Sequence, residues 1–236
     1  MQVSVIVPVF NEAPLIRQFL THLRERAPEA EIVVVDGASS DGTDRLSEGL
    51  CDQLVRTGER SRATQMNAGA RAAGGDILWF LHVDAEVPCT CLDEIDRILC
   101  NPTVSGGYFR IRLPRPFVYR FTDSFAHYAG LFLRMRCGDH GIFCRRSAFT
   151  KVGGFPEVPL MEDVEFFRRL RRCGRVIHSD KRIVISARRY ETIGPARLTL
   201  AYGLIATLYT FGVPLSVLAQ IYQRTCCGAR ETRSAS

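Results

Sequence analysis

The 236-residue sequence is poor in lysine and lacks motifs that mark several protein classes. Only Lys151 and Lys181 are lysines, and the arginines are spread along the chain instead of forming a basic run, so no nucleic-acid partner is expected. The nine cysteines include no C-x-x-C pair, which argues against a structural zinc site. No G-x-G-x-x-G follows a predicted strand, and its absence argues against a nicotinamide oxidoreductase.

A charged leader is also missing, because the chain runs directly into an apolar stretch at 3–7 with no cleavage signal. Together with the odd number of cysteines, this predicts a cytoplasmic protein with free thiols. The length of 236 residues is enough for one large α/β domain or two small ones, and the hydrophobic content of 46% is that of a globular protein. The net charge of +6 favours anionic ligands, such as nucleotide phosphates, or an anionic membrane surface.

Apolar runs alternate with amphipathic segments in the first half of the chain. The runs at 3–9, 32–35 and 77–81 are typical of buried strands, and 54–55 is a short strand. The intervening helices are predicted after Asn11, at 43–50 and at 62–73. Asn11 is expected to cap the first helix, and Asp41 the second. This alternation predicts an α/β fold with a Rossmann-like, doubly wound, mostly parallel sheet, in which ligands bind at the carboxyl ends of strands.

The second half of the chain is less regular. Strands are expected at 107–113 and 142–145, a helix at 118–133 and a loop at 138–141. We expect one domain over 1–190, with halves of about 1–100 and 101–190, followed by an apolar helical segment and a short polar tail over 191–236.

Residues 198–223 contain no charged side chain. As one helix they would span about 39 Å at roughly 1.5 Å per residue, enough to cross a bilayer. Pro214 interrupts this segment, and Gly203 and Gly212 weaken it, so a hairpin lying in the membrane interface is favoured over a span. A buried helical pair or a homodimer interface explains the same pattern.

Two acidic residues, Glu162 and Asp163, open a predicted helix whose apolar positions are Val164, Phe167 and Leu170. A carboxylate in a first helical turn lies near unpaired backbone N–H groups and stays ionised, which suits a general base. The same placement also serves for charge stabilisation of the helix terminus alone, at about 0.3–1 kcal/mol.

Polar residues follow two of the predicted strands. Asp36 ends the second strand and opens a Gly-Ala-Ser-Ser-Asp turn, where its carboxylate can accept hydrogen bonds from a base or ribose, or simply shape the turn. His82 and Asp84 follow the strand at 77–81 and project to one side of it. A carboxylate at such a position can hold a divalent cation bound to phosphates.

Together these segments resemble the family 2 glycosyltransferases, which have the GT-A fold. The resemblance covers roughly residues 1–190 and rests on five motifs in the expected order: Val-Ile-Val-Pro-Val-Phe-Asn-Glu at 5–12, Val-Val-Asp-Gly-Ala-Ser-Ser-Asp-Gly-Thr at 34–43, Asn-Ala-Gly-Ala-Arg-Ala-Ala-Gly-Gly-Asp at 67–76, Leu-His-Val-Asp at 81–84 and Met-Glu-Asp at 161–163. It implies a metal-dependent enzyme that moves a sugar from a nucleotide-diphosphate sugar to an acceptor hydroxyl with inversion.

The resemblance also implies the role of each residue. Asp36 would bind the nucleobase, Asp84 would hold Mg²⁺ or Mn²⁺ on the donor diphosphate, and Asp163 would deprotonate the acceptor. The remaining ligand-binding positions would be Pro8, Phe10 and Glu12 around the nucleotide. Glu162, next to the general base Asp163, would also bind ligand. The acceptor, a small molecule or a lipid, is not indicated.

One position departs from the family pattern, whose metal motif is usually Asp-x-Asp. His82 replaces the first acid, and an imidazole suits Mn²⁺ better than Mg²⁺. His82 is either a second metal ligand or a hydrogen-bonded pocket residue that leaves the metal to Asp84, water and diphosphate.

Within the family the chain is most similar to the radical-SAM/selenodomain-associated transferases, a bacterial subgroup linked to arsenosugar biosynthesis. The similarity lies at 62–69, 138–143 and 153–157. It implies that Arg62, Gln65 and Asn67 face the donor, and that Asp139 and His140 face the sugar or the acceptor. Arg62 would otherwise be an exposed arginine at a helix start.

Two other functions compete with this one. A non-catalytic nucleotide-sugar-binding protein is suggested by His82. A sugar nucleotidyltransferase would need a Gly-rich, basic loop after the first strand, where this chain has Pro-Val-Phe-Asn-Glu.

Overall fold

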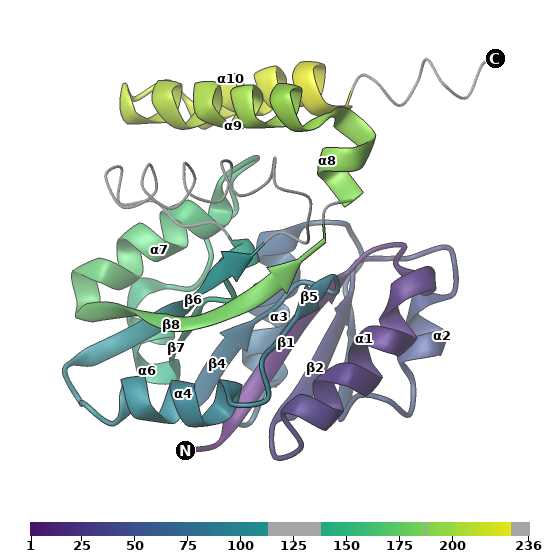
Figure 1. The fold of residues 1–236 in the computed structure, drawn as a ribbon, viewed down its shortest axis with the longest axis vertical. Coiled ribbons are helices and arrows are strands. Elements are labelled where there is room, and N and C mark those ends of the chain that lie inside the picture. Colours follow the sequence, from purple (N-terminus) through teal and green to yellow (C-terminus); the bar gives the residue numbers. More distant parts are fainter. Residues whose placement is uncertain (113–137, 187, 228–236) are drawn as a thin grey trace. The chain divides into compact units, whose positions relative to one another are not determined.

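The structure is a computed structural model that describes residues 1–112, 138–186 and 188–227 (Figure 1). The described residues form two compact units. The first comprises 1–112, 138–157 and 162–185, and the second comprises 158–161, 186 and 188–227.

An eight-stranded sheet forms the centre of the first unit, in the order β3-β2-β1-β4-β7-β6-β8-β5. Its strands are β1 (Val3–Val9), β2 (Glu31–Asp36), β3 (Gln53–Arg56), β4 (Ile77–Phe80), β5 (Ala85–Glu86), β6 (Val104–Arg112), β7 (Phe143–Arg145) and β8 (Arg175–Ile185). Strand β1 pairs in parallel with β2 and β4, and β6 pairs in parallel with β8. Because β7 is antiparallel to both β4 and β6, the carboxyl ends of β1–β4, β6 and β8 lie along one edge.

Helices cover both faces of this sheet. They are α1 (Ala13–Arg26), α2 (Thr43–Ser47), α3 (Arg62–Ala72), α4 (Cys91–Leu99), α6 (Arg146–Val152) and α7 (Glu162–Cys173), with a short 3-10 turn, η1, at Gly138–His140. On one face, buried residues of α3, α6 and α7 pack with those of β1, β2 and β4. The α/β architecture and the mostly parallel sheet are therefore as predicted.

The predicted strands of the first half are confirmed, including the run buried throughout β1. The predicted helix at 43–50 is too long, because α2 ends at Ser47 and Gly49 follows with a φ of +75°. The predicted strand at 107–113 begins earlier, at Val104. The predicted helix at 118–133 lies outside the described residues.

The predicted capping role of Asn11 is wrong. Glu12 occupies the N-cap position of α1, where no side-chain capping bond forms. Asn11 has a φ of +52°, and its Oδ1 atom accepts a hydrogen bond from the backbone N–H of Ser40 instead. The left-handed backbone at Asn11 accompanies this bond to the loop that follows β2, a partner that the local sequence does not reveal.

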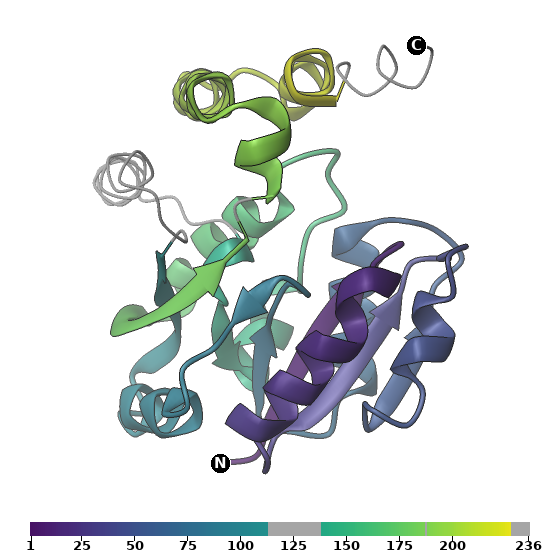
Figure 2. The ribbon, with the colours of Figure 1, turned by 45° about the vertical axis from the view of Figure 1, so that its right-hand side comes forward.

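The second unit contains α8 (Arg188–Ile193), α9 (Pro195–Thr210), α10 (Leu215–Tyr222) and a π-helical turn, η2, at Gln223–Cys227. Helices α9 and α10 lie side by side as a hairpin (Figures 1 and 2). The rings of Tyr202 and Tyr222 stack at 6.4 Å between centroids. The predicted interruption at Pro214 is confirmed, and within the described residues no helix has both the length and the apolarity needed to cross a membrane.

Candidate functional site

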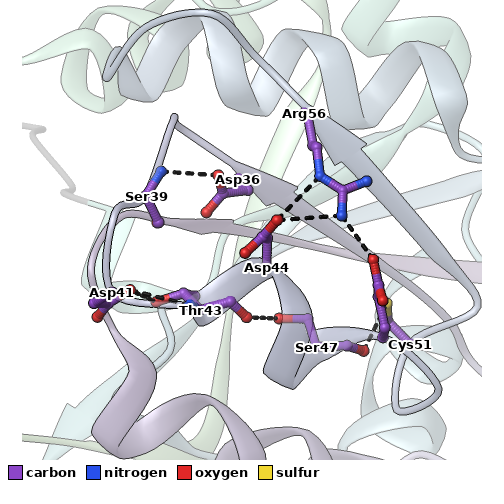
Figure 3. Close-up of polar contacts among 9 residues, drawn as sticks. Asp36, Ser39, Asp41, Thr43, Asp44, Ser47, Cys51 and Arg56 are labelled. Carbon is purple, nitrogen blue, oxygen red and sulfur yellow. Dashed lines mark hydrogen bonds and ion pairs between the residues drawn. The ribbon is translucent and has the colours of Figure 1, made fainter.

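The loop after β1 and the loop after β2 are joined by hydrogen bonds at the carboxyl edge of the sheet. Asp41 accepts hydrogen bonds from the backbone N–H groups of Thr43 and Ala13, both at 3.0 Å (Figure 3 shows the bond to Thr43). The Thr43 hydroxyl in turn accepts from the backbone N–H of Glu12 at 2.8 Å. Desolvation alone would raise the pKa of Asp41, but the hydrogen bonds from Thr43 and Ala13 lower it below its usual value. The ionised carboxylate of Asp41 thus joins the loop after β1 to the loop after β2, and we call these two segments the rim loops.

Asp36, at the end of β2, is buried at 3% exposure. Its Oδ2 atom accepts a hydrogen bond of 2.9 Å from the backbone N–H of Ser39, across a turn in which Ala38 has a φ of +63° (Figure 3). Its Oδ1 atom is buried and has no hydrogen-bond partner among the described residues. An unsatisfied buried carboxylate oxygen is costly, so this atom marks a position where a ligand donor fits.

The predicted nucleotide-pocket residues at the end of β1 differ in their surroundings. Phe10 is half-buried, and the guanidinium of Arg60 lies 4.6 Å above its ring. Pro8 is buried and lines a small apolar pocket together with His82. Arg62 is exposed at the start of α3, one residue after the N-cap Ser61. The contact of Arg60 with Phe10 could not be predicted from the sequence, because a lone arginine in a loop has no spacing signal.

Gln65 ties together the two strand ends that carry Phe10 and Asp36. Its Nε2 atom donates to the carbonyl oxygens of Val9 at 2.8 Å and Val35 at 2.9 Å, and the side chain is buried. Asn67, on the same helix, forms two hydrogen bonds with the backbone of Phe155. Both amides therefore hold the walls of the site in place.

The segment after β4 meets the turn η1. His82 Nε2 lies 3.7 Å from a carboxylate oxygen of Asp139, and the exposed fractions of the two side chains are 14% and 43%. Next to Asp139, His140 is buried, and its Nδ1 atom lies 3.0 Å from the carbonyl oxygen of Phe109. Because a carbonyl only accepts, Nδ1 carries the proton of this hydrogen bond. The segment after β4 and the turn η1 thus lie side by side at His82 and Asp139.

Asp163 lies in the first turn of α7, one residue after Glu162, and both are partly buried. The predicted apolar face of this helix is confirmed, since Val164, Phe167 and Leu170 are buried. Phe166 adds a further anchor that stacks on Phe155 at 4.1 Å and contacts Phe80 edge-on at 6.0 Å. The helix that carries Asp163 and the strand that precedes His82 and Asp84 therefore share one aromatic cluster.

No group of three or more His, Cys, Asp or Glu side chains able to hold a metal ion occurs in the described part of the chain. A cage made entirely of protein ligands is therefore not formed by these residues. Mg²⁺ and similar cations are often held by one or two carboxylates together with substrate phosphates. The single carboxylate of Asp84, beside His82, fits a cation that arrives with a diphosphate.

Comparison with solved structures supports the fold. The mannosyltransferase PcManGT from Pyrobaculum calidifontis, solved with GDP-Man and Mn²⁺, has a TM-score of 0.69 and 23% identity over 100% of this chain and 75% of its own. S. aureus TarS, solved with UDP-GlcNAc, has a TM-score of 0.63 and 18% identity over 79% of this chain and 58% of its own. Glucosyl-3-phosphoglycerate synthase from Mycobacterium tuberculosis has a TM-score of 0.61 and 16% identity over 90% of this chain and 81% of its own.

Sequence comparison gives the family. No curated protein matches the chain. The profile of glycosyl transferase family 2 matches residues 4–151, a range that contains the rim loops, Asp36, the α3 amides, the His82–Asp84 segment and the turn at His140. The chain belongs to glycosyl transferase family 2.

Proposed function

We propose that the protein is an inverting glycosyltransferase that moves a sugar from a nucleotide-diphosphate sugar to an acceptor hydroxyl, with Mn²⁺ or Mg²⁺. The observation that carries this proposal is the buried Oδ1 atom of Asp36, which has no hydrogen-bond partner among the described residues and lies at the carboxyl edge of a doubly wound sheet. A nucleobase N–H would satisfy this oxygen, and Phe10, Glu12 and Pro8 would line the remainder of the nucleotide pocket.

Asp163 is the proposed general base. Its carboxylate takes the proton of the acceptor hydroxyl as the oxygen attacks the anomeric carbon. The bond between that carbon and the diphosphate oxygen breaks, and the nucleoside diphosphate leaves with the bonding electron pair. A single displacement of this kind inverts the anomeric configuration. Glu162, Asp139 and His140 would contact the sugar or the acceptor.

Asp84 would hold the divalent cation, with His82 either as a second ligand or as a pocket residue 3.7 Å from Asp139. The bound cation would neutralise charge on the leaving diphosphate. Arg62, exposed at the start of α3, is available to the same diphosphate. The ligands named for PcManGT, TarS and glucosyl-3-phosphoglycerate synthase, which are GDP-Man, UDP-GlcNAc and UDP with Mn²⁺ in two of the three, support this donor class.

We also propose that the chain belongs to the radical-SAM/selenodomain-associated subgroup and that its glycosyltransferase domain spans 1–190. We propose in addition that the protein is cytoplasmic and contacts the membrane surface or a second copy through 198–223. The contact is supported by an exposed stripe on α9 and the hairpin tip, where Leu200, Leu204 and Phe211 are 74%, 47% and 81% exposed.

A thermal-shift panel of nucleoside diphosphates with Mn²⁺ tests the donor site. A selective ligand raises Tm through a term RT ln(1 + [L]/Kd). We expect one nucleobase to stabilise the protein, and Asp36→Asn to remove most of that shift. Asp76→Asn is the matched control, because Asp76 is an exposed carboxylate that precedes β4, at the opposite end of that strand from the site. Equal shifts in wild type and Asp36→Asn would contradict the proposal.

A non-catalytic binding protein is the second candidate, and His82 in place of a metal-binding acid is the observation that favours it. Donor hydrolysis measured with and without Mn²⁺ separates the two functions, since only an enzyme releases the nucleoside diphosphate. Release of pyrophosphate from a nucleoside triphosphate and a sugar phosphate would instead indicate a sugar nucleotidyltransferase.

A further inference from the structure

Two arginines stand directly opposite each other on neighbouring strands. In the parallel pairing of β6 with β8, Arg110 is the register partner of Arg182. Register partners project to the same face of a sheet, with strands about 4.8 Å apart. Arg112 follows on the same face by the two-residue period and is the register partner of Val184. Like charges opposite each other destabilise a sheet unless an anion or an acid compensates them.

No acid in the described part of the protein forms an ion pair with Arg110 or Arg182. Within the described residues, Arg110, Arg112 and Arg182 form no ion pair or side-chain hydrogen bond, and Arg112 and Arg182 are exposed. Two carboxylates on adjoining elements, Glu165 and Glu86, do not pair with the arginines. Glu165 of α7 pairs with Arg168 at 3.1 Å. Glu86 of β5 lies beyond Val184, one strand further from Arg112.

The strand that carries Arg110 runs along α7 toward the helix start, where Asp163 lies. Leu170 of α7 packs at Gly106 of β6, and the ring of Phe167 contacts Tyr108 at 5.5 Å. Residue numbers in the contacts fall along the helix, from Leu170 to Phe167, while they rise along the strand, from Gly106 to Tyr108. Helix and strand therefore run antiparallel, so that β6 continues from Tyr108 to Arg110 toward the first turn of α7.

The same face also adjoins the turn η1. The ring of Tyr108 contacts His140 at 5.7 Å, and His140 neighbours Asp139, the partner of His82. Asp36 lies on β2, four strands away from β6 in the sheet order. An anion held by the arginines would therefore belong to the acceptor side of the site.

We infer that Arg110 and Arg182 bind a phosphate monoester carried by the acceptor. A phosphate monoester bears about −1.5 to −2 charges at pH 7 and offers three oxygens, which matches two adjacent guanidinium groups. A carboxylate, with a single charge, would leave one arginine uncompensated. This inference rests on the proposed function, because it assigns the phosphate to the molecule whose hydroxyl Asp163 deprotonates.

Calorimetry of the full chain tests the inference. Glycerol 3-phosphate is titrated with and without saturating nucleoside diphosphate and Mn²⁺. The nucleotide blocks the donor diphosphate site, so that the binding that remains in its presence is binding elsewhere, at the arginine pair. A second arm uses phosphatidylcholine vesicles with and without a polyprenyl phosphate, which separates a lipid source of phosphate from a soluble one. Arg110→Gln and Arg182→Gln are compared with Arg175→Gln, an exposed arginine at the other end of β8.

We expect either Arg110→Gln or Arg182→Gln to weaken binding of at least one probe tenfold or more, and Arg175→Gln to leave it within twofold. Tm of the two pair variants should not fall, since each substitution relieves repulsion between like charges. Equal affinity in all variants, or no binding of either probe by the wild type, would overturn the inference. If the nucleotide panel fails while phosphate binding still depends on Arg110, the glycosyltransferase proposal fails and the anion site stands.

Discussion

The carboxamide of Asn67 forms a reciprocal pair of hydrogen bonds with the backbone of Phe155, 88 residues away in the chain. Its Nδ2 atom donates to the Phe155 carbonyl oxygen at 2.8 Å, and its Oδ1 atom accepts from the Phe155 N–H at 2.9 Å. The ring of Phe155 packs on Phe80 and Phe166. Asn67 thereby connects α3 to the aromatic cluster beneath the site.

Removal of this pair should lower stability. We expect Asn67→Ala to reduce the free energy of unfolding by about 1–3 kcal/mol, because a partly buried backbone N–H and C=O lose their partners. Asn67→Asp should cost about as much, since a carboxylate cannot donate to the Phe155 carbonyl. Urea denaturation measures the change, with Gln2→Ala, an exposed amide, as control. A loss below about 0.5 kcal/mol in both Asn67 variants would contradict this role.

Asp163→Asn should reduce kcat by roughly 10²–10⁴, because an amide cannot take the acceptor's proton. Donor binding should stay nearly unchanged. Steady-state kinetics with the donor found in the nucleotide panel measures both quantities. Glu165→Gln is the matched control on the same helix and should keep most of the activity. More than about a tenth of wild-type activity in Asp163→Asn would sink the assignment.

Asp84→Ala should weaken Mn²⁺-dependent binding of the nucleoside diphosphate without lowering Tm, because residues in loops after strands carry function more than stability. Calorimetry with and without Mn²⁺ measures the metal-dependent part of the affinity. Equal affinities in wild type and variant, with Mn²⁺ present, would reject Asp84 as a metal ligand.

His82→Asp should keep or raise the activity supported by Mg²⁺, because Mg²⁺ prefers oxygen ligands to imidazole. The measurement is the ratio of the rates with Mg²⁺ and Mn²⁺ in the variant and the wild type. A severe loss with Mg²⁺ would show a specific task for the imidazole, such as its contact with Asp139.

Glu94 should contribute to stability only above acidic pH. Hydrogen bonds from Arg97, followed by that from Ser179, lower the pKa of Glu94 to about 2 although burial opposes this. A carboxylate whose pKa is lower in the folded state stabilises the protein above its unfolded pKa, about 4.3, and loses this effect as pH falls toward 2. The contribution is on the order of 1–3 kcal/mol.

The Tm difference between wild type and Glu94→Gln should therefore be largest near pH 7 and shrink below pH ~4. Glu25→Gln, at an exposed position of α1, serves as control and should show little difference at any pH. A Tm difference between wild type and Glu94→Gln that stays constant with pH would show that hydrogen bonding alone, without ionisation, accounts for the role of Glu94.

The sequence by itself determined the elements whose side chains follow a simple period. Strand β1 is buried throughout, and α1 and α7 each show one apolar face, so burial could be predicted from local pattern. The motifs that identify the family lie at the ends of such elements, which is why the sequence alone points to Asp36, Asp84 and Asp163 as site residues. Strand β8 escaped prediction because five of its residues between 175 and 182 are charged or histidine, on a strand that is only partly buried.

Only the tertiary structure decided how distant segments satisfy one another. The amides of Gln65 and Asn67 bond backbone groups 30 to 88 residues away, and no local pattern encodes such partners. The pairing of Arg110 with Arg182 depends on an irregularity in the register between Tyr108 and Arg110, since a regular ladder would bring other residues opposite each other. Local periodicity sets which residues are buried, whereas register and long-range hydrogen bonds set which residues meet.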